Sequence, residues 1–266
     1  MTSHPPSNCM RREQIECVPL GQSGFRFAFG STVVYVDPYL SDSVEHSEGP
    51  ELARLVPIWK RPKEIGDADW VLVTHSHIDH CDIDTLVPLS EASGRCRFVG
   101  PSDVADILIG AGIDPSRVVH AGRDWIAMAD DLLVHAVLAA HPTIDLDSAG
   151  NSRYVGYCLE YRGRRIYHSG DTLLNSEVVE AATAFKPISV AMIPVNERNH
   201  YRESRGIIGN MSVRDAFQFA LELQADALVP LHWDMFAPNC VHPDEIEGHY
   251  DRTRPGFELL LRPSLI

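Results

Sequence analysis

A short segment concentrates side chains that bind divalent metal ions. His75, His77, Asp79 and His80 occur within six positions, directly after the apolar run 70–73. His75 and His77 are two residues apart, so on an extended chain they point the same way and can hold one ion. Imidazole and carboxylate suit Zn, Mn or Fe. A polar turn with chance histidines is the alternative, but the dense HxHxDH pattern favours a metal site.

Three further candidate ligands follow apolar runs later in the chain. They are His141 after 132–140, Asp171 in the sequence His-Ser-Gly-Asp-Thr, and His232 after 227–231. Any one of them alone would be structural more often than not. In this order behind the first motif, they predict one site with seven ligands.

The elements that must position these side chains alternate between strand and helix. Periodicity and turn residues predict strands at 24–29, 32–36, 70–74, 97–100, 131–140, 154–161, 164–168, 189–194 and 227–231. They predict helices at 104–111, 175–184 and 213–224, the first of them capped by Ser102 or Asp103 and ended by Gly112. Residues 41–66 are polar and Pro-rich and predict a long surface loop. The pattern indicates an α/β sandwich with the site at strand ends.

Composition limits the classes of function. The 266 residues carry a net charge of -14, which disfavours nucleic acid but leaves room for a small anionic substrate. No apolar run approaches the roughly 20 residues that span a membrane, and residues 1–14 lack a signal-peptide core. We therefore expect a loose tail at 1–14, a single domain at 15–266 and a cytoplasmic location. The six cysteines are expected to be free thiols. We also expect a homo-oligomer.

The motif order HxHxDH, His, GDT, His resembles the metallo-β-lactamase superfamily over nearly the whole chain from about Ile15. Within it, segments 36–38, 98–101, 167–172, 205–211, 231–236 and 243–246 resemble the L-ascorbate-6-phosphate lactonase-like branch. The resemblance implies an α/β fold of four layers, an αββα sandwich. It also implies two divalent ions, one held by His75, His77 and His141, the other by Asp79, His80 and His232, with Asp171 bridging.

Two features depart from that branch. A residue other than His tends to stand there at the position of His141, and the chains of the branch are longer. The presence of His141 favours two ions here, and the shorter chain leaves the substrate open. Asp37 ends a strand, as the first motif of the superfamily does, which predicts that it holds the histidine loop by hydrogen bonds; a plain turn before Pro38 is the equal alternative.

The predicted chemistry is hydrolysis. Metal coordination lowers the pKa of bound water toward about 7, and the hydroxide would attack a lactone carbonyl or a phosphorus. Asp79 and Asp171 are the catalytic candidates, with Asp79 either a ligand or a base. Arg205, Arg202 and Asn196 are candidate binders of an anionic substrate, Arg205 being preferred; a solvated loop with ordinary ion pairs is the alternative.

The leading prediction is a hydrolase that opens a lactone or related ester of a small, possibly phosphorylated, sugar-like molecule. A phosphodiesterase is the alternative within enzymes, and a non-catalytic metal-binding protein on the same fold is the alternative from another class. An RNA nuclease is disfavoured by the acidity of the chain. A redox di-iron role is disfavoured because the flanking residues of His77 are Ser76 and Ile78, where that branch usually has Glu.

Overall fold

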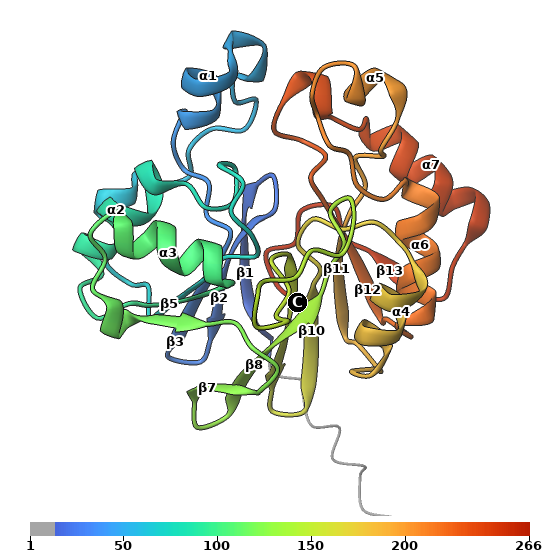
Figure 1. Cartoon of the computed structure of the whole chain (residues 1–266). Coiled ribbons are helices and arrows are strands. Elements are labelled where there is room, and N and C mark those ends of the chain that lie inside the picture. The colour runs from blue at the N-terminus through green and yellow to red at the C-terminus, as the bar shows by residue number, and fades with distance from the viewer. Residues whose placement is uncertain (1–13) are drawn as a thin grey trace, which may run out of the picture.

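Two β-sheets lie face to face in the computed structural model, which describes residues 14–266 (Figure 1). The first sheet has the order β1 (Glu16–Gly21), β2 (Gly24–Phe29), β3 (Thr32–Val36), β4 (Trp70–Leu72), β5 (Arg97–Gly100) and β6 (Val118–His120). The second has the order β13 (Glu258–Leu259), β12 (Ala227–Leu231), β11 (Val190–Pro194), β10 (Arg164–His168), β9 (Val155–Tyr161), β8 (Leu132–Leu138) and β7 (Ile126–Ala129).

The central core lies between the sheets because each sheet turns one apolar face inward. In β2 the alternation is clear: Phe25, Phe27 and Phe29 are buried, and Arg26 between them is only half-buried. These phenylalanines belong to one cluster with Leu159 of β9 and other inward residues of the second sheet. Period-two patterning therefore sets which face of each strand meets the other sheet.

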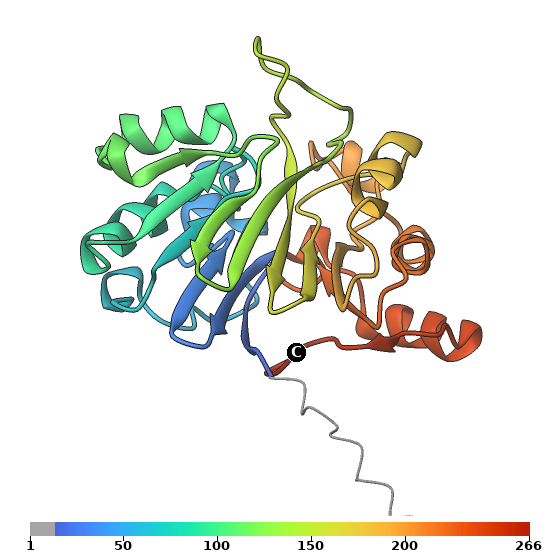
Figure 2. The same ribbon diagram turned by 90° about the horizontal axis from the view of Figure 1, so that it is seen from below.

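Helices cover both outer faces (Figure 2). On the first sheet lie α2 (Ile83–Ala92) and α3 (Ser102–Gly110), and on the second lie α4 (Ser176–Thr183), α6 (Val213–Glu222) and α7 (Pro243–Thr253). Each outer layer has its own apolar cluster, separate from the central one. The short helices α1 (Ser43–Glu48) and α5 (His200–Glu203) stand at one edge of the molecule (Figure 1). The predicted αββα sandwich is confirmed.

Some local expectations were wrong. Residues 41–66 are not a plain loop: they contain α1 and two 3-10 turns, η1 (Pro50–Leu52) and η2 (Pro62–Glu64). Helix α3 begins at Ser102, with Pro101 as the N-cap and no side-chain cap, so neither Ser102 nor Asp103 caps it. Two more turns, η3 (Pro115–Arg117) and η4 (Ala237–Asn239), were not foreseen.

Other expectations concern the ends, the thiols and the membrane. The tail predicted at 1–14 lies outside the described residues except for Gln14. Five cysteines are free within residues 14–266, and Cys9 lies outside that range. In the same part of the chain, no helix has the length and apolar character needed to cross a membrane.

The strand directions decide where the site forms. Strands β10, β11 and β12 are parallel, and β8 has the same direction because it is antiparallel to β9, which is antiparallel to β10. In the other sheet β3, β4 and β5 are parallel. The carboxyl ends of these strands therefore meet at common edges of the two sheets, where ligand sites form in such folds.

Candidate metal centre

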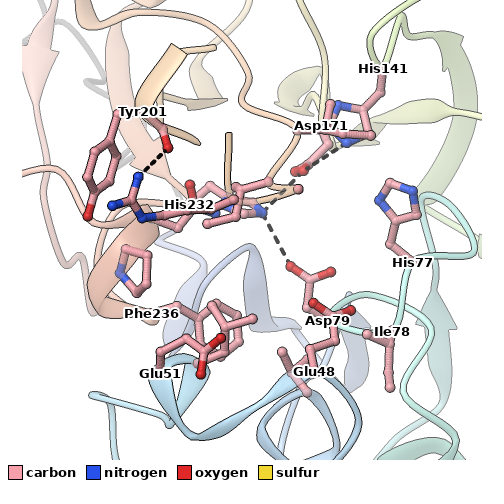
Figure 3. A pocket seen from close by; sticks show the side chains of 18 residues that line it. Glu48, Glu51, His77, Ile78, Asp79, His141, Asp171, Tyr201, His232 and Phe236 are labelled. Atoms are coloured by element: carbon pink, nitrogen blue, oxygen red, sulfur yellow. Dashed lines mark hydrogen bonds and ion pairs between the residues drawn. The ribbon is translucent and has the colours of Figure 1, made fainter. Parts of the chain in front are cut away.

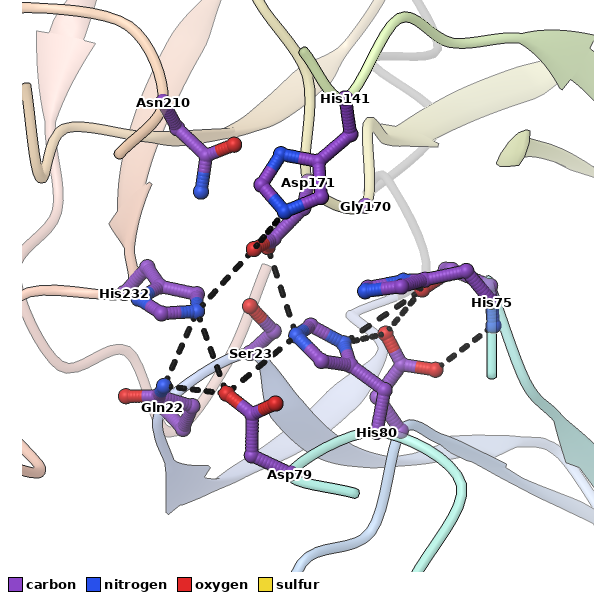
Figure 4. A network of polar contacts seen from close by, with 12 residues as sticks. Gln22, Ser23, His75, Asp79, His80, His141, Gly170, Asp171, Asn210 and His232 are labelled. Carbon is purple, nitrogen blue, oxygen red and sulfur yellow. Dashed lines mark hydrogen bonds and ion pairs between the residues drawn. The ribbon is translucent and has the colours of Figure 1, made fainter. Parts of the chain in front are cut away.

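All seven predicted ligands converge at this edge, and Figure 4 shows six of them: His75, Asp79, His80, His141, Asp171 and His232. His75 to His80 form the bends and turn that follow β4, and the backbone N–H of His80 donates to the His77 carbonyl at 3.0 Å. His141 follows β8, Asp171 follows β10, and His232 is the first residue after β12. The centre is thus built from both sheets.

Gly170 allows Asp171 to approach the first motif closely. Its φ is +60°, and a Cβ there would lie 2.7 Å from the Val155 carbonyl oxygen and 2.9 Å from Cβ of Thr74. Only glycine fits a position with such a backbone and such close neighbours. The sequence Ser-Gly-Asp therefore has a packing reason as well as a chemical one.

The first group of donors is His75, His77 and His141. The ring centroid of His77 lies 4.5 Å from that of His75 and 5.1 Å from that of His141. One possible ligand atom from each of the three residues lies within 4.8 Å of the other two. Burial is the main cause that lowers the pKa of all three imidazoles, to about 4 for His141. They are therefore neutral at pH 7, as metal ligation requires.

The second group is Asp79, His80 and His232, with Asp171 between it and the first. The Nε2 atom of His232 lies 3.1 Å from Asp171 Oδ2 and 3.4 Å from Asp79 Oδ2. Nε2 of His80 lies 3.4 Å from Asp171 Oδ1, and Nε2 of His141 lies 3.7 Å from Asp171 Oδ2. Asp171 thus contacts a histidine of each group, the position that a bridging ligand needs.

Charges in the second group compensate one another. Burial alone would lower the pKa of His232, but the carboxylates of Asp171 and Asp79 outweigh it and raise that pKa to about 9. The same balance raises the pKa of His80. Burial opposes ionisation of Asp79 and Asp171, yet the two imidazoles lower the pKa of both. The two imidazoles and the two carboxylates of this group therefore stabilise each other's charged forms.

Orphaned polar atoms show that the residues fit metal ions. Among residues 14–266, Nε2 of His75, Nε2 of His80 and Oδ1 of Asp171 are fully buried and have no hydrogen-bond partner. Leaving such groups unpaired costs roughly 1–3 kcal/mol each. Three buried donor atoms that face one another are explained by divalent cations, which would coordinate all of them.

Asp37 lies where the sequence predicted, beneath the histidine loop. Its Oδ2 is 2.7 Å from Nδ1 of His80 and accepts the Thr74 hydroxyl at 2.7 Å, while its Oδ1 accepts the Thr74 backbone N–H at 2.8 Å. The carboxylate therefore fixes the ring of His80 with Nε2 directed at the centre, the usual task of a carboxylate behind a ligating histidine.

The structure places two of the three predicted substrate residues away from the pocket. Asn196 is buried and donates to Oδ1 of Asn239 at 3.1 Å, and Nε of Arg202 donates to the same oxygen at 3.0 Å. Nδ2 of Asn239 lies 3.2 Å from Nδ1 of His232. Asn196 and Arg202 thus support His232 through Asn239, a residue that the sequence reasoning missed.

Arg205 does line a pocket next to the centre, and Figure 3 shows that pocket. The pocket has a volume of about 590 Å³ and is reached by His77, Asp79, His141, Asp171 and His232. The Arg205 guanidinium lies 3.8 Å from the Tyr201 ring centroid and donates to the Tyr201 carbonyl at 2.9 Å. The pocket lining outside the centre also includes the carboxylates of Glu48 and Glu51. Its apolar walls include Leu52, Ile78 and Phe236.

Comparisons with known proteins agree with this architecture. A family model described as the beta-lactamase superfamily domain matches residues 32–233. The chain therefore belongs to the metallo-β-lactamase superfamily.

Among curated proteins, the chain is 27% identical over 222 residues to the probable L-ascorbate-6-phosphate lactonase UlaG of Salmonella heidelberg (strain SL476) and to that of Escherichia coli O139:H28. Each match covers 77% of this chain and 61% of the relative's length.

Solved structures share the fold at low sequence identity. The metallo hydrolase Igni18 from Ignicoccus hospitalis has a TM-score of 0.71 and 17% identity, and the match covers 96% of this chain and 98% of that one. The isothiocyanate hydrolase from Delia radicum gut bacteria has a TM-score of 0.72 and 16% identity, with 95% and 97% covered.

Proposed function

We propose that this protein is a two-metal hydrolase that opens a lactone or a related ester of a small molecule carrying an anionic group, such as a phosphorylated sugar-like compound. The observation that carries the proposal is the convergence of seven histidine and aspartate side chains, five of which line one pocket. The lactonase names of the similar proteins support the reaction class, although the match covers 61% of their length.

The donor set divides between two ions, Zn or Mn, with Fe a further candidate. His75, His77 and His141 would hold one ion, and Asp79, His80 and His232 the other, with Asp171 between them. Bound there, the ions would supply an activated water at neutral pH and polarise the attacked oxygen of the substrate. Asp171 is almost fully buried, whereas the Asp79 side chain is 18% exposed.

That difference assigns tasks to the two carboxylates. Asp171 is enclosed by His80, His141 and His232, so it organises the centre. Asp79 reaches the pocket, and its carboxylate can accept a proton from a group bound there. Arg205 would bind the anionic group of the substrate, and the apolar wall with Ile78 and Phe236 would exclude water beside the reacting bond.

A hydrolysis screen paired with elemental analysis tests the proposal. Purified protein should contain divalent metal and hydrolyse lactones or esters faster than bis-p-nitrophenyl phosphate. Asp171→Ala or His77→Ala should lower the metal content and the activity. Losing a residue that only supports a metal ligand typically reduces activity about 10–100-fold. The loss here should be larger, since each substitution removes a ligand itself. His120→Ala is the matched control, because His120 is an exposed histidine at the end of β6.

Three results would decide against the proposal. Turnover of the phosphodiester without turnover of any lactone or ester would make the protein a phosphodiesterase. Metal-free protein of normal stability would indicate a binding protein on the same fold. Full activity in either site variant would refute the assigned centre.

A further inference from the structure

The turn between β1 and β2 inserts an uncharged side chain among the donors of the second group (Figure 4). Gln22 occupies this turn with φ +57° and is only 4% exposed. Its carbonyl accepts the His232 backbone N–H at 2.9 Å, and its own N–H donates to Asp234 Oδ1 at 3.2 Å. The backbone of Gln22 is thus fixed against the segment that carries His232.

The side chain of Gln22 contacts two of the predicted ligands directly. Its Nε2 donates to Asp79 Oδ2 at 2.7 Å and lies 2.9 Å from Nε2 of His232. Figure 4 shows Nε2 facing the cluster and Oε1 pointing away from it. The carboxamide therefore occupies the place toward which Asp79 and His232 direct their ligand atoms.

Three polar atoms converge on Nε2 of His232: Asp171 Oδ2 at 3.1 Å, Asp79 Oδ2 at 3.4 Å and Gln22 Nε2 at 2.9 Å. A single hydrogen on an imidazole nitrogen cannot point at all three. A cation suits such a cluster, because oxygen and nitrogen lone pairs can all face it.

Of the two carboxamides that touch His232, Gln22 is the one free to turn over. Asn239 already uses Oδ1 to accept from Asn196 and Arg202, so rotating its amide would break both bonds. Rotation of the Gln22 amide places Oε1 where Nε2 now lies, and an amide oxygen is a good ligand for hard divalent ions such as Mn.

We propose that Gln22 is a further ligand of the second group: its carboxamide lies between Asp79 and His232, and its Oε1 would coordinate the ion that they hold. The inference rests on the proposed metal centre but not on the substrate. It gives the second position a ligand set of carboxylate, amide and two imidazoles, richer in oxygen than the three-histidine first position.

Substitution at Gln22 with direct measurement of metal binding tests this. Protein stripped by chelation is titrated with Mn²⁺ by calorimetry, and bound metal is counted by elemental analysis. Wild type should bind two equivalents. Gln22→Asn shortens the side chain by one methylene and remains compatible with positive φ. This variant should bind the equivalent at the first group as before and the equivalent at the second group about 10–100-fold more weakly. Gln224→Asn is the matched control, since Gln224 is exposed and also has positive φ, 51°.

A second variant separates ligation from simple hydrogen bonding. Gln22→Glu keeps the length of the side chain and presents oxygen in either rotamer, so it should bind both equivalents at least as tightly as wild type. If Gln22 only donated to Asp79, Glu would repel that carboxylate and weaken binding as much as Asn. Weakened binding by Gln22→Glu would overturn the proposal. Unchanged or tighter binding by Gln22→Asn, or equal weakening of both equivalents in that variant, would do the same. So would a single bound equivalent in wild type. Failure of the lactone screen would leave these binding results unaffected.

Discussion

At the residue scale, Arg205 offers a test of substrate charge. It is the one arginine or lysine among the described residues that line the pocket, and Glu48 and Glu51 on the same lining oppose further negative charge. Arg205→Gln should raise KM about tenfold or more for a phosphorylated lactone, because a charge-assisted hydrogen bond contributes roughly 1.5–3 kcal/mol, and should leave KM for a neutral lactone nearly unchanged.

Arg198→Gln is the control for this prediction. Arg198 belongs to the same segment but pairs with Glu203 at 2.6 Å and does not belong to the pocket lining. Equal KM changes for the charged and neutral substrates in Arg205→Gln would show that the side chain shapes the pocket and does not recognise charge.

Residue types and spacing predicted the histidine–aspartate set because metal ligands are rare and leave a local pattern. They could not reveal Gln22 or Asn239, since a lone carboxamide carries no such pattern. Both residues contact His232, from which Gln22 is more than 200 positions away and Asn239 seven positions away. Asn196 and Arg202 suited an anion site by type alone; only their buried hydrogen bonds to Asn239 show that they support His232.

At the scale of elements, helix α6 tests how far local sequence fixes local structure. Ser212 accepts the Asp215 N–H at 3.1 Å, and the Asp215 side chain accepts from the backbone of Ser212, a complete capping box. Ser212→Ala should lower the free energy of unfolding by about 1 kcal/mol in urea titration. Ser176→Ala, at the first turn of α4 where Asn175 is the cap, should change it by much less; equal losses would contradict the capping argument.

The same local rules explain which elements were foreseen. Strand β12 and the hairpin of β9 and β10 are apolar runs bounded by turn residues, so their predicted bounds agree closely with the structure. Helix α2 was missed because it contains Pro88 and follows the histidine turn without a clear break. Helix α1 is only six residues long, too short for helical periodicity to be visible.

At the scale of the whole molecule, the centre joins the two sheets. His75 to His80 follow a strand of the first sheet, and His141, Asp171 and His232 follow strands of the second. Each of the two donor groups therefore takes residues from both sheets, and an ion held by either group would link the sheets. The expected cytoplasmic location and homo-oligomeric state stay predictions.

Metal loading should therefore raise the thermal stability of the whole fold. A ligand that binds only the folded state stabilises it by about 2.7 kcal/mol at 100 times its Kd. For a domain of this size 1 kcal/mol corresponds to roughly 2–4 °C in Tm, so chelation should lower Tm by about 5–10 °C, measured by calorimetry at fixed protein concentration.

The control is Asp171→Ala, which removes the carboxylate that contacts histidines of both groups. Its Tm should respond much less to added metal than that of wild type, because the shared donor is gone. An equal response in the two proteins would mean that the ion stabilises the fold from some other place, and the centre at the joined strand ends would lose its structural role.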